Sequence, residues 1–272
     1  MPRDVGWKLD PAIVVALAAY AGIYVWRFSR ARREASGRGA GPLQAVAAVG
    51  ALLTLVIALL SPVDPLGERY LFSAHMLQHV LLGDVAPLLS LLALSRVILR
   101  PATRRLVRVE RALGPLAHPV TALVVSLSLL YVWHVPALYQ AALRDPTVHA
   151  LEHASFFAAG VAVWWPLVQP IPMRHRLTGL WTFAYMGTAK LGVGALGVFF
   201  TWSSTVVYPF YAQAPRVWGL SPLDDQNVGG AVMMVEQSVV LVIAFAILFV
   251  RMLAQSEEDD QRRERLEEAA LT

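Results

Sequence analysis

Apolar residues fill seven long stretches of this chain, and the connections between them are short and rich in Pro, Gly, Arg and Asp. A helix needs about 20 such residues to cross roughly 30 Å of hydrocarbon. The stretches lie near 11–28, 43–60, 71–94, 119–136, 150–168, 178–201 and 228–250. The pattern predicts an all-α polytopic membrane bundle of seven transmembrane helices, with the two ends of the chain on opposite sides.

The composition agrees with a membrane protein. Of 272 residues, 57% are hydrophobic and 15% are charged, and the mean hydropathy is +0.53. Soluble domains carry about 25% charged residues. No cysteine is present, which excludes disulfides, thiolate metal ligands and cysteine nucleophiles. We expect residues 1–255 to form one seven-span bundle and residues 256–272, where acidic and basic residues mix, to form a charged cytoplasmic tail.

Arginine is concentrated at alternate ends of the predicted spans. The connections after the first, third and fifth spans and the tail are rich in Arg, whereas the other connections carry few basic residues. Because Lys and Arg favour the cytoplasmic side, the N-terminus is expected outside and the C-terminus inside. The pI near 9.6 is explained by these short loops, so we expect contact with the lipid bilayer and no nucleic-acid partner.

Five of the seven histidines are predicted to lie at the outer ends of the spans. They are His75 and His79 in the third span, His134 at the end of the fourth, and His149 and His153 at the start of the fifth. Residues i and i+4 share one helix face, roughly 6 Å apart, so each pair can offer two imidazoles to one ion. A polar ring in hydrocarbon must also find a partner. The pattern therefore predicts metal or haem ligation, and the two remaining histidines, in basic loops, are expected to be structural or solvated: His118 and His175.

Other charged residues near or within the spans are further candidates. Glu152 and Asp225 could accept a ring N–H and fix the tautomer of a ligand, or could instead cap a helix. Asp84 and Lys190 are the charges deepest in the spans, where an ionisable group implies a partner. They could form a structural ion pair or a proton or ion relay, or Lys190 could reach the membrane surface. Trp164 and its neighbour are expected in an interfacial aromatic belt.

Five short motifs follow one another along the chain. They read SAHMLQH at 73–79, WHVPALY at 133–139, HALEHAS at 149–155, WWP at 164–166 and DQ at 225–226. Their order and spacing resemble those of the CtaG-type cytochrome c oxidase assembly factors over about residues 40 to 250. The chain departs from that pattern at residues 232–237, which read VMMVEQ where a Trp and a Pro-Gly kink are expected.

The resemblance implies a multi-pass protein of the bacterial plasma membrane that helps mature haem-copper oxidase. It implies a cytochrome c oxidase subunit as partner, and copper as the metal held by the five histidines. The residues alone do not separate copper from zinc, because imidazole suits both as well as iron. No nucleophile elbow, P-loop or dinucleotide-binding fingerprint is present, so we do not expect an enzyme.

Two further functions stay open on the sequence. The first is a transporter that moves copper or another divalent ion inward, with Asp84, Lys190 and Glu236 along the path. The second is a membrane cytochrome that holds haem between a histidine of the third span and one of the fifth.

Overall fold

The structure is a computed structural model that describes residues 4–171 and 174–271, with the side chains of the last helix covered only in part beyond residue 247. Every regular element in these ranges is a helix. In chain order the elements are α1 (Pro11–Glu34), α2 (Pro42–Leu60), α3 (Val63–Arg69), α4 (Phe72–Val80), η1 (Leu81–Val85), α5 (Ala86–Leu92), α6 (Arg100–Leu113), η2 (Gly114–Ala117), α7 (Pro119–Trp133), α8 (Pro136–Arg144), α9 (Pro146–Val168), α10 (Leu180–Trp202), α11 (Pro209–Gln213) and α12 (Pro222–Leu271).

Local chemistry explains where many of these helices begin. Proline is the first residue of α1, α2, α7, α8, α9, α11 and α12, a position where its missing N–H costs nothing. Asp10 and Asp145 cap α1 and α9, and the Asp145 carboxylate accepts from the Thr147 backbone N at 2.7 Å. The predicted fourth span extends to residue 136, but α7 already ends at Trp133 and Pro136 begins α8.

Six helices are long and apolar enough to cross a membrane. They are α1, α2, the continuous stretch Phe72–Leu92, α9, α10 and the part Pro222–Ile247 of α12. A seventh is reached if α6, η2 and α7, which bend by 72°, count as one span. The predicted all-helical architecture is thus confirmed, with six helices, or up to seven, that could cross a membrane. α12 continues through residue 255, where the charged tail is predicted to begin, and ends at Leu271.

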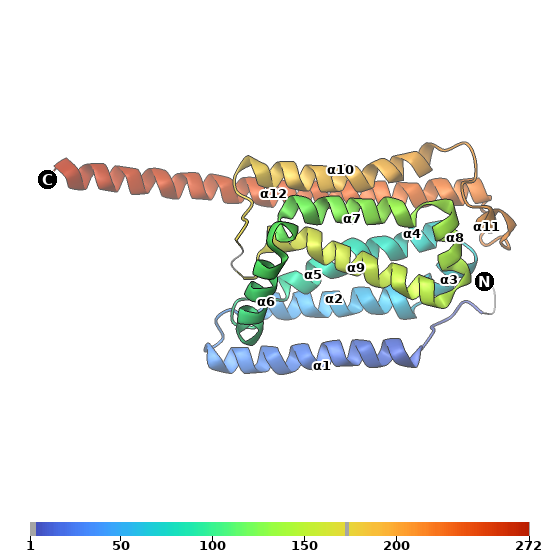
Figure 1. Ribbon diagram of the computed structural model, residues 1–272, viewed down its shortest axis with the longest axis horizontal. Helices are drawn as coiled ribbons and strands as arrows, with labels where there is room; N and C mark the ends of the chain where they lie inside the picture. Colours follow the sequence, from blue (N-terminus) through green and yellow to red (C-terminus); the bar gives the residue numbers. More distant parts are fainter. Residues whose placement is uncertain (1–3, 172–173, 272) are drawn as a thin grey trace.

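The helices form a bundle whose two ends differ (Figure 1). α1 and α2 lie along one edge, α10 and α12 pack together along the opposite edge, and α4, α5, α7 and α9 lie between them. The short helices α3, α8 and α11 close one end, called here the histidine end. α6 lies across the other end, called the arginine end, and α12 extends beyond it.

Glycines bring the central helices into close contact. A Cβ atom at Gly160 of α9 would overlap the carbonyl oxygen of Gly83, so α9 packs directly on the π-helical turn η1. A Cβ atom at Gly67 would lie 2.9 Å from the Cα of His75, so α3 also packs closely on α4. π-helical turns are rare and occur often at functional sites. These contacts set the positions of the helices that carry four of the five histidines.

Candidate metal centre

All five predicted histidines meet at the histidine end. α4 carries His75 and His79, α9 carries His149 and His153, and His134 follows the last residue of α7. The ring centroids lie 4.3 Å apart for His75 and His79, 4.0 Å for His149 and His153, 6.0 Å for His79 and His153, and 5.7 Å for His79 and His134. Each residue is at most 8% exposed. The five imidazoles therefore form one buried group, called here the histidine cluster.

Glu152 reaches from α9 into the middle of this cluster. Its two carboxylate oxygens lie 3.7 Å from His75 Nε2 and 3.5 Å from His79 Nε2, and its side chain is fully buried. His75, His79, Glu152 and His153 can offer one donor atom each, all within 4.8 Å of one another. Three imidazoles and one carboxylate form a donor set that suits copper or zinc.

Several polar atoms of the histidine cluster and of Glu152 lack hydrogen-bond partners among the residues that the structure describes. They are both ring nitrogens of His75 and of His79, Nε2 of His134, His149 and His153, and both carboxylate oxygens of Glu152. Buried polar atoms are nearly always paired, and each unpaired one costs about 1–3 kcal/mol. A bound cation would satisfy several of these lone pairs at once, so the residues fit a metal ion.

Two of the rings are held in a tautomer that suits ligation. His134 Nδ1 donates to the Leu130 carbonyl oxygen at 2.8 Å, which leaves the lone pair on Nε2. His149 Nδ1 lies 3.1 Å from Glu68 Oε1, so a proton on Nδ1 has an acceptor there and Nε2 again carries the lone pair. Anchoring of one ring nitrogen is the usual way in which a protein orients a metal-binding imidazole.

A second group of possible ligands adjoins the cluster and was not predicted from the sequence. Asp64, Glu68 and His149 offer donor atoms within 4.8 Å of one another. The Lys8 ammonium lies 3.3 Å from an oxygen of each carboxylate. The hydrogen bond from His149 lowers the pKa of Glu68 to about 2, and Lys8 acts in the same direction against the effect of burial. The two acids lie on α3, within what the sequence presents only as a turn-rich connection.

Asp225 supports the cluster through the backbone. Its carboxylate accepts from Phe72 N at 2.6 Å and from Ser73 N at 3.2 Å. These are the first backbone N–H groups of α4, so Asp225 caps the helix that carries His75 and His79. Among the described residues its hydrogen bonds go to this helix terminus rather than to an imidazole ring.

Aromatic rings close the cluster on one side. The Tyr139 ring lies 5.0 Å from that of His75 and stacks on Tyr208 at 3.9 Å. The Tyr208 hydroxyl donates to the His134 carbonyl oxygen at 2.8 Å. Burial raises the pKa of Tyr139 and of Tyr211, which keeps both phenols neutral. These rings exclude water from the cluster without adding charge to it.

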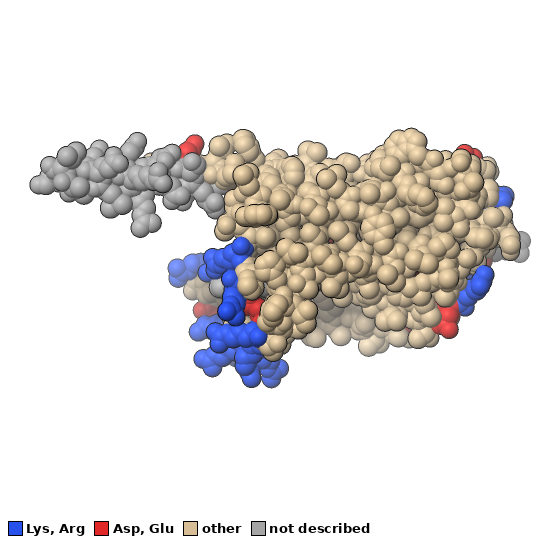
Figure 2. Space-filling view, turned by 45° about the horizontal axis from the view of Figure 1, so that its top comes forward, with Lys and Arg blue, Asp and Glu red and all other residues tan. Residues whose placement is uncertain are grey.

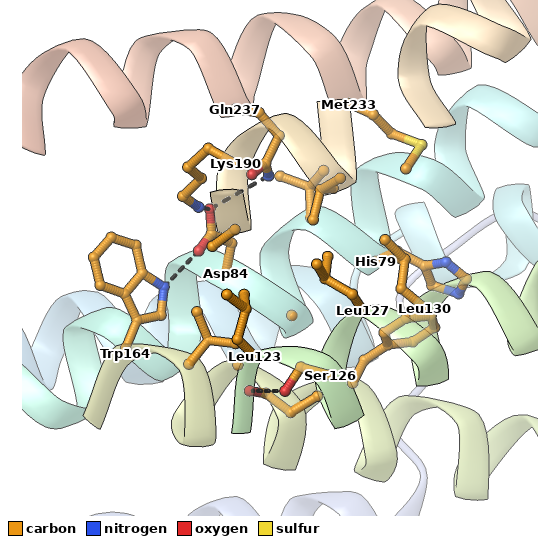
Figure 3. Close-up of a pocket in the computed structure, with 18 residues that line it drawn as sticks. His79, Asp84, Leu123, Ser126, Leu127, Leu130, Trp164, Lys190, Met233 and Gln237 are labelled. Carbon is orange, nitrogen blue, oxygen red and sulfur yellow. Dashed lines mark hydrogen bonds and ion pairs between the residues drawn. The ribbon is translucent and has the colours of Figure 1, made fainter. Parts of the chain in front are cut away.

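A cavity of about 90 Å³ leads from His79 deeper into the bundle (Figure 3). At its far end Lys190 donates to Asp84, and both residues are buried. Trp164 Nε1 also donates to Asp84, and Gln237 Nε2 lies 3.4 Å from Asp84 Oδ2. Trp164 is 5% exposed, so its predicted place in an interfacial belt is wrong, because its N–H serves a buried carboxylate instead.

The two remaining histidines lie apart from the cluster. The rings of His118 and His175 pack against each other with centroids 4.9 Å apart. His118 precedes α7 and its Nδ1 accepts from Val120 N at 3.2 Å, whereas His134 follows the other end of the same helix. A 15-residue helix is about 22 Å long, so these two rings cannot share an ion with the cluster.

Comparison with known proteins gives one family and a few distant relatives. The family model for the cytochrome c oxidase caa3 assembly factor, Caa3_CtaG, matches residues 22–255. Uncharacterized proteins of Mycobacterium bovis and Mycobacterium tuberculosis are each 27% identical over 278 residues, and one of Mycobacterium leprae is 26% identical over 280. The alignments cover 94% of this chain but only 40% of each relative. No solved structure matches the chain.

Proposed function

Because the chain belongs to the cytochrome c oxidase caa3 assembly factor family, we propose that it binds a copper ion in the histidine cluster and supplies it to an oxidase subunit during assembly. The observation that carries this proposal is the set of unpartnered donor atoms on His75, His79, Glu152 and His153. A carrier needs no catalytic turnover, so the protein acts as a metal-holding scaffold rather than as an enzyme.

The donor set favours a transition metal that can leave again. Imidazoles with one carboxylate bind copper without the thiolates that trap Cu(I), and this chain contains no cysteine. His134 lies outside the group of four, but its ring centroid is 5.7 Å from that of His79. Its Nε2 has no hydrogen-bond partner among the described residues and can replace a ligand as the ion moves. Five imidazoles around one carboxylate allow the ion to change partners without passing through an unligated state.

The interior of the bundle favours holding the ion over passing it inward. The cavity beyond His79 is lined mainly by apolar side chains and ends at the Lys190–Asp84 ion pair. The Lys190 ammonium there already compensates the charge of the Asp84 carboxylate, so the pair offers little net attraction to a further cation. A transporter would need further ligands along this path, so we rank transport below metal holding.

We further propose seven spans, with the N-terminus outside and the C-terminus inside a bacterial plasma membrane. α1 begins at the histidine end of the bundle, and α12 extends beyond the arginine end, in Figure 1. On the face drawn in Figure 2, Lys and Arg gather at the arginine end, over α6, and few lie at the histidine end. Since basic residues mark the cytoplasmic side, this distribution supports a position of the histidine cluster at the outer face.

Metal analysis of the purified full chain tests the proposal. We expect near-stoichiometric copper in the wild type, and a clear loss in His79→Ala and His153→Ala. His175→Ala removes an imidazole outside the cluster and is expected to keep the wild-type copper content. In cells, the two cluster variants should reach the membrane in normal amounts while the oxidase contains less copper.

Three results would contradict this function. Normal maturation of the oxidase with either cluster variant would remove these histidines from the role. A Soret band in the purified wild type would indicate haem instead of copper, and uptake of copper into proteoliposomes would indicate transport.

A further inference from the structure

Side-chain burial at the histidine end increases in steps from the surface to the cluster. Exposure is 44% at Lys8, 19% at Glu68, 8% at Asp64 and 7% at His149, and it reaches 0% at Glu152. The steps therefore mark a polar route by which a cation can reach a cluster that is itself closed to solvent.

Two carboxylates form the outer part of this route and already hold a positive charge. The Lys8 ammonium lies 3.3 Å from Asp64 Oδ2 and 3.3 Å from Glu68 Oε2. Asp64 is fixed in place because Gln78 Nε2, on α4, donates to its other oxygen at 2.8 Å. Two carboxylates and one ammonium leave one negative charge in excess, whereas a divalent cation in place of the ammonium makes the group neutral. A divalent cation would therefore balance the two carboxylates more fully than the lysine does.

His149 connects the carboxylates to the histidine cluster. Its Nδ1 lies 3.1 Å from Glu68 Oε1, and its ring centroid lies 4.0 Å from that of His153 and 5.4 Å from that of His75. The residue is 5% exposed, and its Nε2 has no hydrogen-bond partner among the described residues. One ring thus contacts the outer carboxylates and the inner imidazoles, with a buried nitrogen free to bind an ion.

We propose that Asp64, Glu68 and His149 form an outer cation station, covered by Lys8, that captures a hydrated divalent cation and delivers it to the histidine cluster. The proposal rests on the proposed function, since the station serves the metal held in the cluster. Carboxylate oxygens bind a hydrated ion readily and weakly, and imidazoles bind copper more tightly, so the ion moves inward down a gradient of affinity. Lys8 swings out to solvent when the cation arrives.

A purely structural role for Lys8 makes a different prediction. Lys8 also donates its backbone N–H to the Leu60 carbonyl oxygen at 2.9 Å, and its ion pairs could simply hold the N-terminal segment on the bundle. A second ion pair, from Arg69 to Asp4 at 2.9 Å, holds the same segment through residues other than Asp64, Glu68 and His149. Asp4→Asn is therefore the matched control, because it loosens the segment without changing the station.

The test measures how fast copper is loaded rather than how much is bound. The full chain in detergent is mixed rapidly with Cu²⁺, loading is stopped with excess chelator at set times, and protein-bound copper is determined by elemental analysis. Fixed charges raise association rates by about 10- to 1,000-fold. Asp64→Asn with Glu68→Gln is expected to slow loading by about tenfold or more. Lys8→Met is expected to speed loading, and Asp4→Asn to leave it unchanged.

The outcomes separate this proposal from the function on which it rests. Loading at the wild-type rate in the carboxylate variant, or equal slowing in Asp4→Asn, overturns the outer station and leaves the cluster intact. A wild type that takes up no copper overturns both. Size-exclusion profiles check that the carboxylate variant is folded. Lys8→Met gives an independent result, because it is expected to change the loading rate in the opposite direction. Slower loading in Lys8→Met also overturns the station.

Discussion

Removal of Lys190 is expected to destabilise the protein strongly, because it leaves the Asp84 carboxylate buried without a cation. Asp84 is 7% exposed and Lys190 is 4% exposed. Breaking a buried ion pair by removing one partner costs about 3–5 kcal/mol. The hydrogen bonds from Trp164 and Gln237 remain in Lys190→Met but carry no full positive charge (Figure 3). A typical free energy of unfolding is about 5–15 kcal/mol, so this single change removes a large part of it.

A double variant and an exposed pair give the comparison. Lys190→Met with Asp84→Asn removes both charges, and the asparagine oxygen can still accept from Trp164, so most of the lost stability should return. Glu34→Gln breaks an ion pair between exposed side chains, since Glu34 is 33% and Arg30 is 56% exposed. This change is expected to lower the free energy of unfolding by at most about 1 kcal/mol.

Unfolding by SDS in mixed micelles, followed by tryptophan fluorescence, measures these differences. The reasoning is refuted if Lys190→Met is as stable as Glu34→Gln. It is also refuted if the double variant is less stable than Lys190→Met, because the pair would then stabilise the bundle by something other than compensation of charge.

Three further predictions follow from particular contacts. Gly230→Ala should destabilise the bundle by about 1–3 kcal/mol in the same assay, because the added Cβ would lie 2.6 Å from a carbonyl oxygen on α10. Gly22 has open space around it, so Gly22→Ala should leave the stability unchanged. Asp225→Ala should cost about 1–2 kcal/mol, since it leaves the first N–H groups of α4 without an acceptor. The pKa of Glu68 is lowered from 4.5 to about 2 by the hydrogen bond from His149, so its ionised form stabilises the protein above pH 4.5 and this contribution is lost as the pH falls towards 2. Wild type should therefore be more stable than Glu68→Gln at pH 6 and lose that advantage at low pH. A stability advantage of the wild type that grows on acidification would contradict the prediction.

The sequence by itself is enough for the family and for the helical membrane architecture. Both predictions are confirmed: the family model covers residues 22–255, and six helices, or up to seven, can cross a membrane. Runs of about 20 apolar residues allow few other structures, since every backbone polar group in a bilayer must be paired within the chain. The same runs place each histidine near the end of a span, so that their common depth follows from counting residues along the helices.

The fourth span shows where such counting stops. Residues 119–136 are apolar enough to be read as one crossing, yet α7 ends at Trp133 and bends by 72° from the helix before it. Trp164 looks like a residue at the membrane surface but donates to Asp84 inside the bundle. Local hydrophobicity cannot distinguish a lipid-facing indole from a buried one, because both environments are apolar.

Tertiary packing alone decided which side chains share the site. Glu152 lies within 4 Å of His75 and His79, more than 70 residues away in sequence, because Gly160 lets α9 approach η1 until backbone meets backbone. The acids Asp64 and Glu68 join His149 only because α3 folds back on α4. Periodicity tells which residues share a face of one helix and at what depth, whereas the rotation of one helix against another depends on contacts between distant segments, and these form only in the folded bundle.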